Sequence, residues 1–511
     1  MPQPPSPLSA LWSATTSLQS YPTLTHDLHV DVAIVGGGIT GLTTAYHLVH
    51  AGLRVAVLEA FRIGMGTTGS STGNLYVPVD EHLSTVASKH DEATLRAVAT
   101  CRKAALDFIA HRMEEFHIAC AFERVPWFLF ADPHSQQTSQ AVDERQAANR
   151  AGLSASGSVP DQFPYEVGAM AQLADQAQFN PLQYVQGLAA ALADHENCLI
   201  FENTQVTQVE DKGPCVVQTA GGQVKAQSVV MATHTPKGIY GVHTAMECYR
   251  EAAMAVRLKG DLPAGGIYWH LQQQKHYSVR PYRDATGDYL IAIGEPHLPG
   301  HDDDESFQTL ETYLRAHFAV DQVAYRWAAQ KYQPADTLPY IGVSPLQKHV
   351  YIATGFSADG LIWGTAAGHL LCDAILQREN PYARYFDPKR FTPVASAPRL
   401  LKEGMVVAQH LVSDYLFYGD AKALEEVRPG EGKTLKLDGE KVAAYRDEAG
   451  RLYVVSSVCP HMGCIVHWNA VEKSWDCPCH GSRFAVDGQV LEGPAYHPLA
   501  PKSPHVPSSQ A

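Results

Sequence analysis

Long apolar runs and an excess of basic residues are both absent from this 511-residue sequence. No stretch reaches the roughly 18 apolar residues that a membrane-spanning helix needs. The first residues, MPQPPSPLSALW, carry no lysine or arginine ahead of a short apolar patch, so we recognise no export signal. Lysine and arginine total 39 against 53 aspartates and glutamates, which argues against a nucleic-acid partner. We therefore expect a cytoplasmic protein with no membrane span.

Cysteine is scarce and unevenly spread. Six of the ten cysteines are scattered singly, as is typical of buried thiols in a reducing compartment: Cys101, Cys120, Cys198, Cys215, Cys248 and Cys372. The other four lie close together and are interleaved with histidines: Cys459, Cys464, Cys477 and Cys479. This second group predicts a chemical site near the end of the chain rather than a disulfide framework.

The order of the segments predicts two or three domains. A lead rich in Pro, Ser and Thr over 1–28 is expected to drape over the surface. An α/β domain over 29–390 follows, with an inserted mixed-sheet (α+β) substrate subdomain at about 240–350. A linker and bridging helix over 391–423 leads to a small all-β domain over 424–505, where short strands alternate with turn signals.

A glycine-rich turn lies between two predicted strands near the start. HVDVAIV (29–35) is a predicted strand, Gly36-x-Gly38-x-x-Gly41 opens a helix, and LRVAVLEA (53–60) is the next strand and carries Glu59. Such glycines let the backbone approach a pyrophosphate at a helix N-terminus, while the acid accepts the ribose hydroxyls. A tight strand–helix turn without a ligand is the alternative. The fingerprint occurs once, which favours FAD over a nicotinamide dinucleotide.

These segments resemble the glycine/D-amino-acid oxidase-like (DadA-type) family of FAD oxidoreductases. The loop GTTGSSTGN (66–74) and the segments FNPLQYVQGL, TLPYIG and TGFSADGLIWGTAAG add to the resemblance. It implies an FAD-binding Rossmann-like domain and oxidation of a C–N bond in an amino acid or amine. It also implies contacts to FAD from a small-residue loop and from a late loop near the isoalloxazine, namely Thr67, Thr68, Gly355, Phe356, Gly360, Gly364 and Thr365.

The resemblance also suggests residues for substrate binding. Arg280 stands roughly where related flavoenzymes place an arginine or tyrosine that clamps a substrate carboxylate, and a planar guanidinium suits that contact. A solvated strand arginine is the alternative. His276, Tyr277 and Tyr332 are expected to line the same cavity, with ordinary packing as the alternative. No general base is named, because a neutral amine can transfer hydride directly.

Two short motifs near the end combine thiols with imidazoles. Cys459-Pro-His461 and Cys477-Pro-Cys479-His480 have the C-x-H and C-x-x-H spacing of a Rieske [2Fe–2S] centre, in which two thiolates bind one iron and two imidazoles the other. A structural zinc site is the alternative, but it has no need of an extra cysteine in each loop. The repeated extra cysteine therefore favours the cluster.

The same motifs resemble those of Rieske domains. The resemblance implies four iron ligands, Cys459, His461, Cys477 and His480. It implies a disulfide between Cys464 and Cys479 and a hydrogen bond from Ser482 to a bridging sulfide. Phe484 stands where respiratory Rieske proteins have a tyrosine that bonds a cysteine sulfur, so we expect a potential in the lower or middle part of the Rieske range.

The two predicted cofactors suggest a function together. A flavin takes two electrons from a substrate, whereas a Rieske centre takes one at a time, so we expect a dehydrogenase that supplies an external one-electron carrier. The pairing resembles a bacterial group of DadA-like oxidoreductases with a C-terminal Rieske domain. Two alternatives stay open: an enzyme in which a ferredoxin reduces the cluster and the flavin then reduces or hydroxylates a substrate, and a redox-sensing module.

Overall fold

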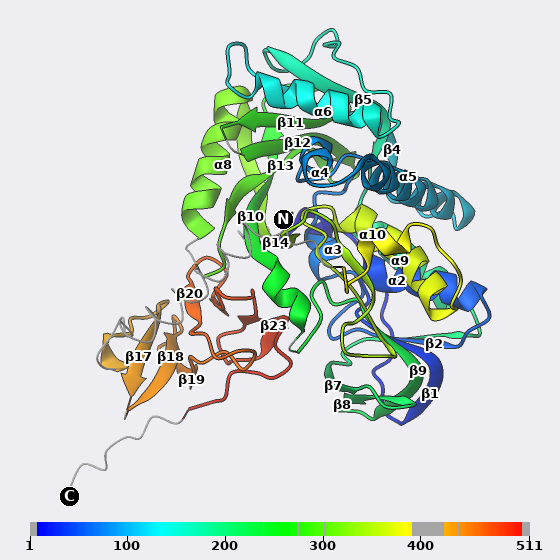
Figure 1. Ribbon diagram of the computed structural model, residues 1–511. Coiled ribbons are helices and arrows are strands. Elements are labelled where there is room, and N and C mark those ends of the chain that lie inside the picture. The colour runs from blue at the N-terminus through cyan, green and yellow to red at the C-terminus, as the bar shows by residue number, and fades with distance from the viewer. Residues whose placement is uncertain are drawn as a thin grey trace, which may run out of the picture.

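The computed structural model describes residues 8–238, 240–273, 275–300, 303–390, 424–437 and 439–502. The linker and bridging helix expected at 391–423 lie outside these residues. The described residues form two large sheets with helices packed on them and a small all-β domain at the C-terminal end (Figure 1). This is the fold class that the sequence predicts.

The first large sheet is mainly parallel and carries the glycine-rich turn. Val32, Ala33, Ile34 and Val35 are buried, as expected for the apolar run that ends at Gly36. Its strands in spatial order are β15 (Tyr340–Val343), β16 (Val350–Thr354), β9 (Gln223–Met231), β1 (Leu28–Val35), β2 (Val55–Leu58) and β6 (Cys198–Phe201). In addition, β8 (Cys215–Thr219) pairs with β9, and β7 (Val206–Glu210) pairs with β8. The chain order gives a βαβ unit in which β1 and β2 are parallel neighbours.

Helices pack on this sheet and on one another. Two of these helices begin at a side-chain cap: Asp91 accepts from the amide of Thr94, and Asn180 accepts from the amide of Leu182. The helices of this part of the chain are α2 (Ile39–His50), α3 (Thr67–Ser70), α4 (Leu83–Lys89), α5 (Glu92–Glu115), α6 (Thr138–Arg150), α7 (Pro181–Ala193), α9 (Gly360–Ile375) and α10 (Ala383–Phe386). Helices α2 and α9 pack together, which brings the two glycine-rich loops to one place.

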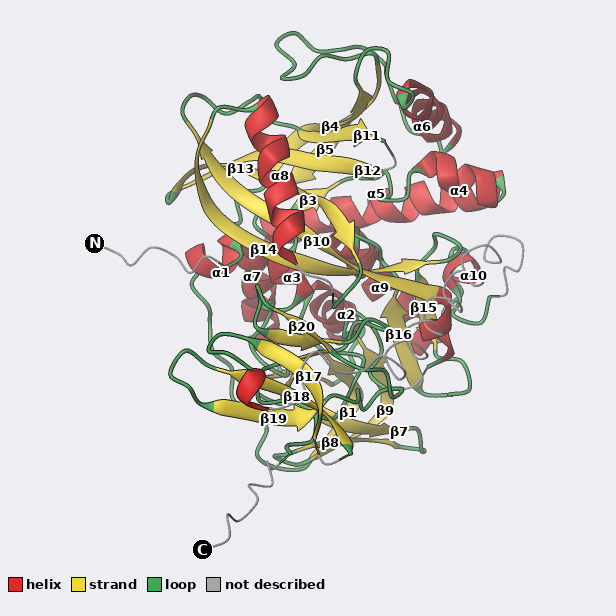
Figure 2. Ribbon diagram, turned by 90° about the vertical axis from the view of Figure 1, so that its left-hand side faces the viewer, coloured by secondary structure: helices red, strands yellow, loops and turns green. Residues whose placement is uncertain are grey.

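The second large sheet is mainly antiparallel and lies above the first in Figure 2. Its strands in spatial order are β14 (Val320–Pro334), β10 (Met246–Leu258), β13 (Gly287–His297), β12 (Lys275–Asp284), β11 (Ile267–Gln272), β4 (Glu123–Ala131), β5 (Ala169–Gln178) and β3 (Asn74–Leu75). Helix α8 (Asp303–His317) covers part of one face. The sheet therefore draws strands from 74–178 as well as from the region around 240–350 in which the substrate subdomain is expected.

The N-terminal lead is packed more tightly than the sequence suggests. It contains a short helix, α1 (Leu11–Thr15), whose Leu11 and Trp12 are completely buried. The indole nitrogen of Trp12 donates to the carbonyl of Ser71 at 2.6 Å. The expectation of a draped surface segment is therefore wrong for these residues, because two large apolar side chains anchor them beside the loop at 66–74.

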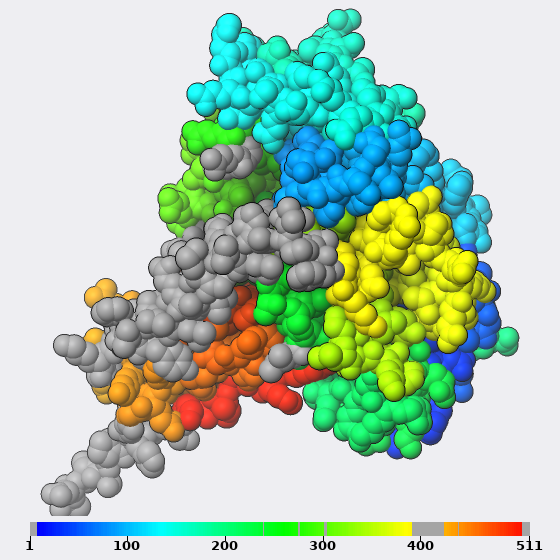
Figure 3. Space-filling view, viewed as in Figure 1, coloured from blue at the N-terminus to red at the C-terminus, as the bar shows by residue number. Residues whose placement is uncertain are grey.

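The C-terminal domain contains two small antiparallel sheets. The first comprises β17 (Gly432–Leu437), β18 (Glu440–Arg446) and β19 (Leu452–Ser456), and the second comprises β20 (His467–Asn469), β21 (Ser474–Asp476), β22 (Arg483–Phe484) and β23 (Val490–Glu492). Cys459, Cys477, Trp475 and Phe484 share one buried core. In the space-filling view the orange and red surface of this domain abuts the green surface of the second large sheet (Figure 3).

Among the helices of the described residues, none combines the length and the apolar character that crossing a membrane requires.

Candidate functional site

The glycine-rich turn after β1 is closely packed. A Cβ on Gly41 would lie 2.0 Å from the carbonyl oxygen of Gly36, and one on Gly36, whose φ is +110°, would lie 2.4 Å from the carbonyl oxygen of Ala232. Neither position therefore accepts a side chain. Gly36 and Gly38 line a cavity of about 380 Å³, and Gly38 is the N-cap of α2. The N-terminus of α2 thus borders a space where an anionic group can bind.

Glu59 and the loop at 66–74 lie beside this turn. The Glu59 carboxylate accepts hydrogen bonds from the amides of Gly37 at 2.7 Å and Phe61 at 2.9 Å. Burial raises the pKa of this carboxyl, although these two amides lower it. Thr68 Oγ1 accepts from the amide of Ile39 at 3.2 Å, which ties the loop to α2. Glu59, Thr67 and Thr68 all line the cavity.

The late glycine-rich loop contributes only part of the predicted set to the cavity. Phe356 and Gly360 line it. Gly355, with φ +74°, bends the chain between β16 and α9. Gly364 and Thr365 lie further along α9: a Cβ on Gly364 would lie 2.4 Å from Thr40 Oγ1, and Thr365 Oγ1 donates to the carbonyl of Leu361 at 2.8 Å. The structure therefore places these two in helix packing.

The inner end of the cavity is formed by a different set of elements, mostly strands of the second large sheet. Trp269 of β11, His276 of β12, Glu251 of β10 and Lys331 of β14 line it, together with Asp80 from the segment between β3 and α4. The ammonium of Lys331 lies 3.0 Å from Asp80 Oδ2 and 2.9 Å from Glu251 Oε1. The His276 ring stacks on the Trp269 indole with centroids 4.4 Å apart.

The charged groups at this inner end shift one another's pKa values. Burial alone would raise the pKa of the Asp80 carboxyl, but the Lys331 ammonium, with smaller contributions from His276 and His82, lowers that pKa to about 2. Burial raises the pKa of Glu251 in spite of the same ammonium. Burial lowers the pKa of His276 to about 3, so its imidazole is neutral at physiological pH. The inner end therefore holds one ammonium between two carboxyl groups, beside a neutral imidazole.

Of the four predicted substrate residues, the structure places only His276 on the cavity wall. Arg280 is 1 % exposed, and its guanidinium donates to the carbonyls of Thr72 at 2.7 Å and Phe179 at 3.2 Å. Its side chain holds the loop at 66–74 against the start of α7. The geometry therefore does not support a role for Arg280 as a substrate clamp.

The two tyrosines also lie elsewhere. The Tyr277 ring stacks on Tyr313 of α8 with centroids 3.8 Å apart, and its hydroxyl donates to Glu295. The Tyr332 hydroxyl lies 3.3 Å from the carbonyl oxygen of His480 and faces the C-terminal domain. Sequence reasoning missed Asp80, Glu251, Trp269 and Lys331. No local motif marks these four residues, because they meet only when the second sheet forms.

In the C-terminal domain the two cysteine–histidine loops fold alike. The amide of Cys459 donates to the carbonyl of Cys464, and the amide of Cys477 donates to the carbonyl of Ser482, each at 2.8 Å. The amides of Gly463 and Gly481 close the loops by donating back to Cys459 and Cys477, each at 3.0 Å. The sequence therefore builds two matched turns that bring one thiol and one imidazole each to the same place.

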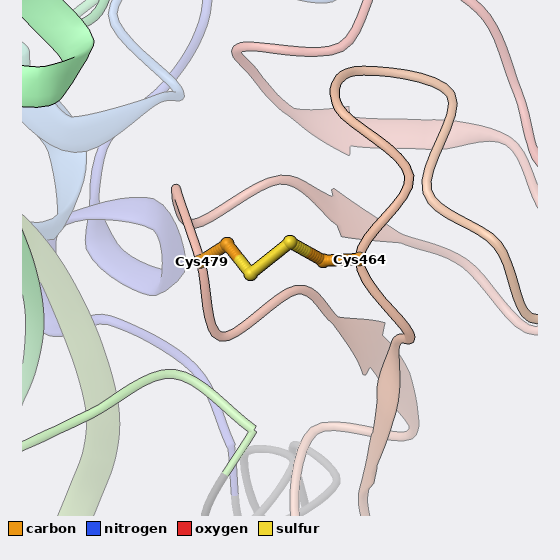
Figure 4. The surroundings of a disulfide bond; sticks show 2 residues. All are labelled: Cys464 and Cys479. Atoms are coloured by element: carbon orange, nitrogen blue, oxygen red, sulfur yellow. A yellow bond between two sulfur atoms is a disulfide. The ribbon is translucent and has the colours of Figure 1, made fainter. Parts of the chain in front are cut away.

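A disulfide joins the two loops, as predicted. Cys464 and Cys479 are bonded, with their Cα atoms 6.5 Å apart, and Figure 4 shows the bond crossing from one loop to the other. Cys459 and Cys477 keep free, buried thiols. The hydroxyl of Ser482 accepts from the amide of Ala495 at 3.1 Å.

The four predicted ligands fit an iron–sulfur cluster. The His461 and His480 ring centroids are 4.9 Å apart, and within the described residues the Nδ1 atom of each ring is buried without a hydrogen-bond partner. Burial lowers the pKa of His461, and that of His480 to about 4, so both rings are neutral, as metal ligands must be. A hydrogen bond with Cys477 lowers the pKa of the Cys459 thiol. Two unpaired imidazole nitrogens beside two free thiols are the donor set that a Rieske cluster uses.

The histidine end of these loops packs on the flavin side of the molecule. His461 Nε2 lies 3.2 Å from the carbonyl oxygen of Gly238. Gln330 Nε2 donates to the carbonyl of Gly481 at 2.9 Å, and Arg250 forms an ion pair with Glu472. Leu491, Glu492 and Gly493 line the same cavity as the glycine-rich turn. The proposed cluster site and the dinucleotide cavity are therefore neighbours.

Two family models match the chain. Residues 31–374 match FAD dependent oxidoreductase, and residues 419–504 match Rieske [2Fe-2S] domain. The chain belongs to the FAD-dependent oxidoreductase family. It is an oxidoreductase with a C-terminal Rieske domain, and its cofactors are FAD and a [2Fe–2S] cluster.

Relatives agree with this architecture. The "Putative Rieske 2Fe-2S iron-sulfur protein YhfW" of Bacillus subtilis (strain 168) is 31 % identical over 502 residues, which cover 96 % of each chain. The gamma-glutamylputrescine oxidoreductase of Escherichia coli (strain K12) is 25 % identical over 393 residues, 74 % of this chain and 89 % of that one. The crystal structure of glycine oxidase from Geobacillus kaustophilus matches 71 % of this chain and 99 % of its own, with a TM-score of 0.59 and 19 % identity. The last of these supports the fold.

Proposed function

We propose that the protein is a dehydrogenase that oxidises a C–N bond of an amine or amino acid and sends the electrons singly through its own Rieske cluster to an external carrier. One observation carries this proposal: the end of the Rieske domain that bears His461 and His480 packs on the flavin domain, and residues 491–493 line the flavin cavity. A Rieske domain that served a separate partner at this end would present both histidines to solvent. Here they are 7 % and 8 % exposed.

The chain's own residues have separate tasks in this proposal. When bound, FAD supplies two-electron oxidation and the cluster supplies one-electron transfer. Gly36 and Gly38 let the pyrophosphate reach the N-terminus of α2, and Glu59 accepts the ribose hydroxyls. Thr67, Thr68, Phe356 and Gly360 complete the walls. Gly41, Gly355, Gly364 and Thr365 shape the turn and α9 behind them.

The Rieske loops hold the cluster with the predicted ligands. Cys459 and Cys477 would hold one iron, and His461 and His480 would hold the other through their Nδ1 atoms, which have no hydrogen-bond partner among the described residues. The disulfide between Cys464 and Cys479 holds the loops at a fixed separation. Ser482 forms a hydrogen bond with the Cys459 thiol, and its hydroxyl would donate to a sulfide of a bound cluster.

Two side chains connect the cavity to the cluster loop. His234 Nδ1 lies 3.0 Å from Thr67 Oγ1 and 3.3 Å from Glu492 Oε1, so His234 contacts both domains. Its ring meets the Tyr332 ring edge-on, with centroids 4.8 Å apart. The Tyr332 hydroxyl in turn contacts the carbonyl of His480. These packed contacts keep the flavin site and the cluster site in a fixed relation, which electron transfer between them requires.

The substrate class and the cellular setting rest on indirect support. The name of the Escherichia coli relative states an oxidoreductase acting on gamma-glutamylputrescine, which supports an amine or amino-acid derivative here. Eight cysteines are free and buried, and six of them lie far from the disulfide loops in sequence, which supports a cytoplasmic location. The external acceptor is a one-electron carrier, because the cluster releases electrons singly.

Anaerobic reduction tests the proposal. Purified holoenzyme is mixed with a panel of amines and amino acids, and the flavin spectrum and the Rieske EPR signal are recorded. We expect one class of substrate to bleach the flavin and to generate the signal of the reduced cluster, with turnover when an artificial one-electron acceptor is added. Reduction only by reduced ferredoxin would instead support the reverse direction. Failure of every substrate to support turnover with the acceptor would leave the redox-sensing alternative.

A further inference from the structure

The inner end of the cavity has more carboxyl groups than basic side chains. Asp80 and Glu251 flank Lys331, and behind them Asp359 pairs with Arg102 at 3.2 Å and accepts from the amide of Asp80 at 2.9 Å. Three carboxyl groups therefore stand against two basic side chains, and the neutral His276 adds no charge. Burial raises the pKa of Glu251 and raises that of Asp359 to about 6. Asp80 is 6 % exposed and Asp359 is 4 % exposed, so little water screens the difference. Burial disfavours the charged form of a carboxyl group, and a cationic ligand beside it would stabilise that form.

Cations that could hold a carboxylate are engaged elsewhere. Three basic side chains of the described residues line the cavity: Lys237, Lys331 and Arg483. Lys331 is held by two carboxylates. Arg483 pairs with Asp476 at 3.1 Å and also with Glu472. Lys237 interacts electrostatically with Glu59, beside the glycine-rich turn, and with Glu492 of the C-terminal domain. Arg280, the predicted clamp, does not line the cavity and is bonded to the backbone carbonyls of Thr72 and Phe179.

The walls offer acceptors and an aromatic face. Asn74 lines the cavity, is 8 % exposed, and donates its amide to Ser278 at 3.1 Å, while within the described residues its Oδ1 atom has no partner. A carbonyl-type oxygen accepts from an N–H group and repels a carboxylate. Trp269 provides an indole beside the charged group, a surface that also attracts cations. Each of these features suits an ammonium group.

We propose that the cavity binds an amine that enters as a cation and carries no carboxylate beside the reacting carbon, with Asp80, Glu251 and Asn74 as the groups that recognise it. This inference rests on the proposed function, which leaves amines and α-amino acids both open, and it chooses between them. A carboxylate in the same place meets two carboxylates and no free cation. Specificity then comes from repulsion of the wrong ligand as well as attraction of the right one.

Two ligands of matched shape and opposite charge test the choice. tert-Butylammonium and pivalate have similar size, and neither has a hydrogen on the carbon that bears its charged group, so neither is oxidised there. Their binding to the oxidised holoenzyme is followed by difference absorbance of the flavin at pH 8 and constant ionic strength, where ordinary imidazoles are neutral. We expect tert-butylammonium to bind at least about tenfold more tightly than pivalate, a difference of about 1.4 kcal/mol.

A variant that removes the charge of Glu251 tests whether this residue recognises the ammonium group. Glu251→Gln keeps the shape of the side chain and should weaken tert-butylammonium binding about tenfold or more while pivalate binding stays equal or improves. Glu247→Gln, on the same strand but outside the cavity lining, is the matched control and should change neither. The comparison of the two ligands on the unmodified enzyme decides the matter even if a variant fails to fold.

The outcomes separate this inference from the proposed function. Equal or tighter binding of pivalate overturns the inference, and so does the absence of any flavin perturbation by tert-butylammonium. If pivalate binds better and an amino acid reduces the flavin, the dehydrogenase proposal stands and the choice of substrate class fails. If tert-butylammonium binds as expected and no amine or amino acid reduces the flavin, the dehydrogenase proposal fails and the recognition of amines stands.

Discussion

The cluster site and the inner end of the flavin cavity are built in opposite ways. The proposed iron ligands and the disulfide all come from two turns, at 459–464 and 477–482. The charged group of the cavity joins Lys331 to Asp80, which is 251 positions away in the chain. A site made by short turns is visible as spacing in the sequence, whereas a site made by a sheet is visible only after the sheet has formed.

The largest effect is expected at the cluster site, whose proposed ligands all come from two short turns of the sequence. Cys477→Ser removes one thiolate from the four-ligand set, so the cluster should be lost completely while flavin content stays unchanged, because Cys477 belongs to the separate C-terminal core. Iron analysis and the EPR spectrum of the reduced protein measure the change. Cys372→Ser, at another buried free cysteine, should keep the cluster. Retention of a normal Rieske signal by Cys477→Ser would show that the ligand set is wrong.

The difference in construction explains what could be predicted. The fold class, the disulfide and the position of the four proposed ligands follow from short motifs in which each residue lies near its partner in sequence. Arg280 was expected at the substrate because its strand position resembles that of related enzymes, yet its guanidinium binds the carbonyls of Thr72 and Phe179. Which face a strand residue presents, and what meets it, depends on neighbours such as Phe179 that are far away in the chain.

The glycine-rich turn combines both kinds of construction. Its glycines are close together in the sequence, but Gly36 packs against the backbone of Ala232, which is far away in the chain. Gly41→Ala would place a Cβ 2.0 Å from the carbonyl oxygen of Gly36 and push the turn out of shape. We expect most of the bound FAD to be lost, measured as the ratio of flavin to protein absorbance. Gly241→Ala, at a glycine whose Cβ would meet nothing within 4 Å, is the control. Full FAD occupancy in Gly41→Ala would contradict the proposed site.

A matched pair of glycines sharpens the comparison at the junction of the two domains. Gly463 and Gly481 occupy the same place in the two cluster loops, with φ values of +82° and +74°. A Cβ on Gly463 would meet nothing within 4 Å, whereas one on Gly481 would lie 2.4 Å from Cys248 Sγ of the flavin domain. Alanine therefore imposes similar backbone strain at both, but only Gly481→Ala separates the domains.

The expected result concerns electron transfer inside the chain. Gly481→Ala should slow reduction of the cluster after flavin reduction about tenfold or more relative to Gly463→Ala, if it costs the docked state about 1.4 kcal/mol or more. Stopped-flow absorbance under anaerobic conditions resolves the two steps. Equal rates in the two variants would mean that the contact with Cys248 does not hold the redox sites together.

The smallest expected effect concerns the cluster potential. Phe484 is completely buried in the same core as Cys459 and Cys477, so Phe484→Tyr would place a hydroxyl near the cluster sulfurs. One hydrogen bond of about 1 kcal/mol to the reduced form would raise the potential by roughly 40 mV. A redox titration followed by EPR measures the shift, and Phe484→Leu controls for altered packing. An unchanged potential would show that the residue's surroundings differ from those in the respiratory proteins.

The central claim is that electrons pass from the flavin to the cluster within one chain. Anaerobic mixing of holoenzyme with its amine substrate, followed by stopped-flow absorbance and freeze-quench EPR at two protein concentrations, tests it most directly. The account predicts that flavin bleaching is followed by the reduced-cluster signal at a rate that does not depend on protein concentration. A flavin that stays reduced beside an oxidised cluster, or a cluster that is reduced faster at higher protein concentration, would contradict it.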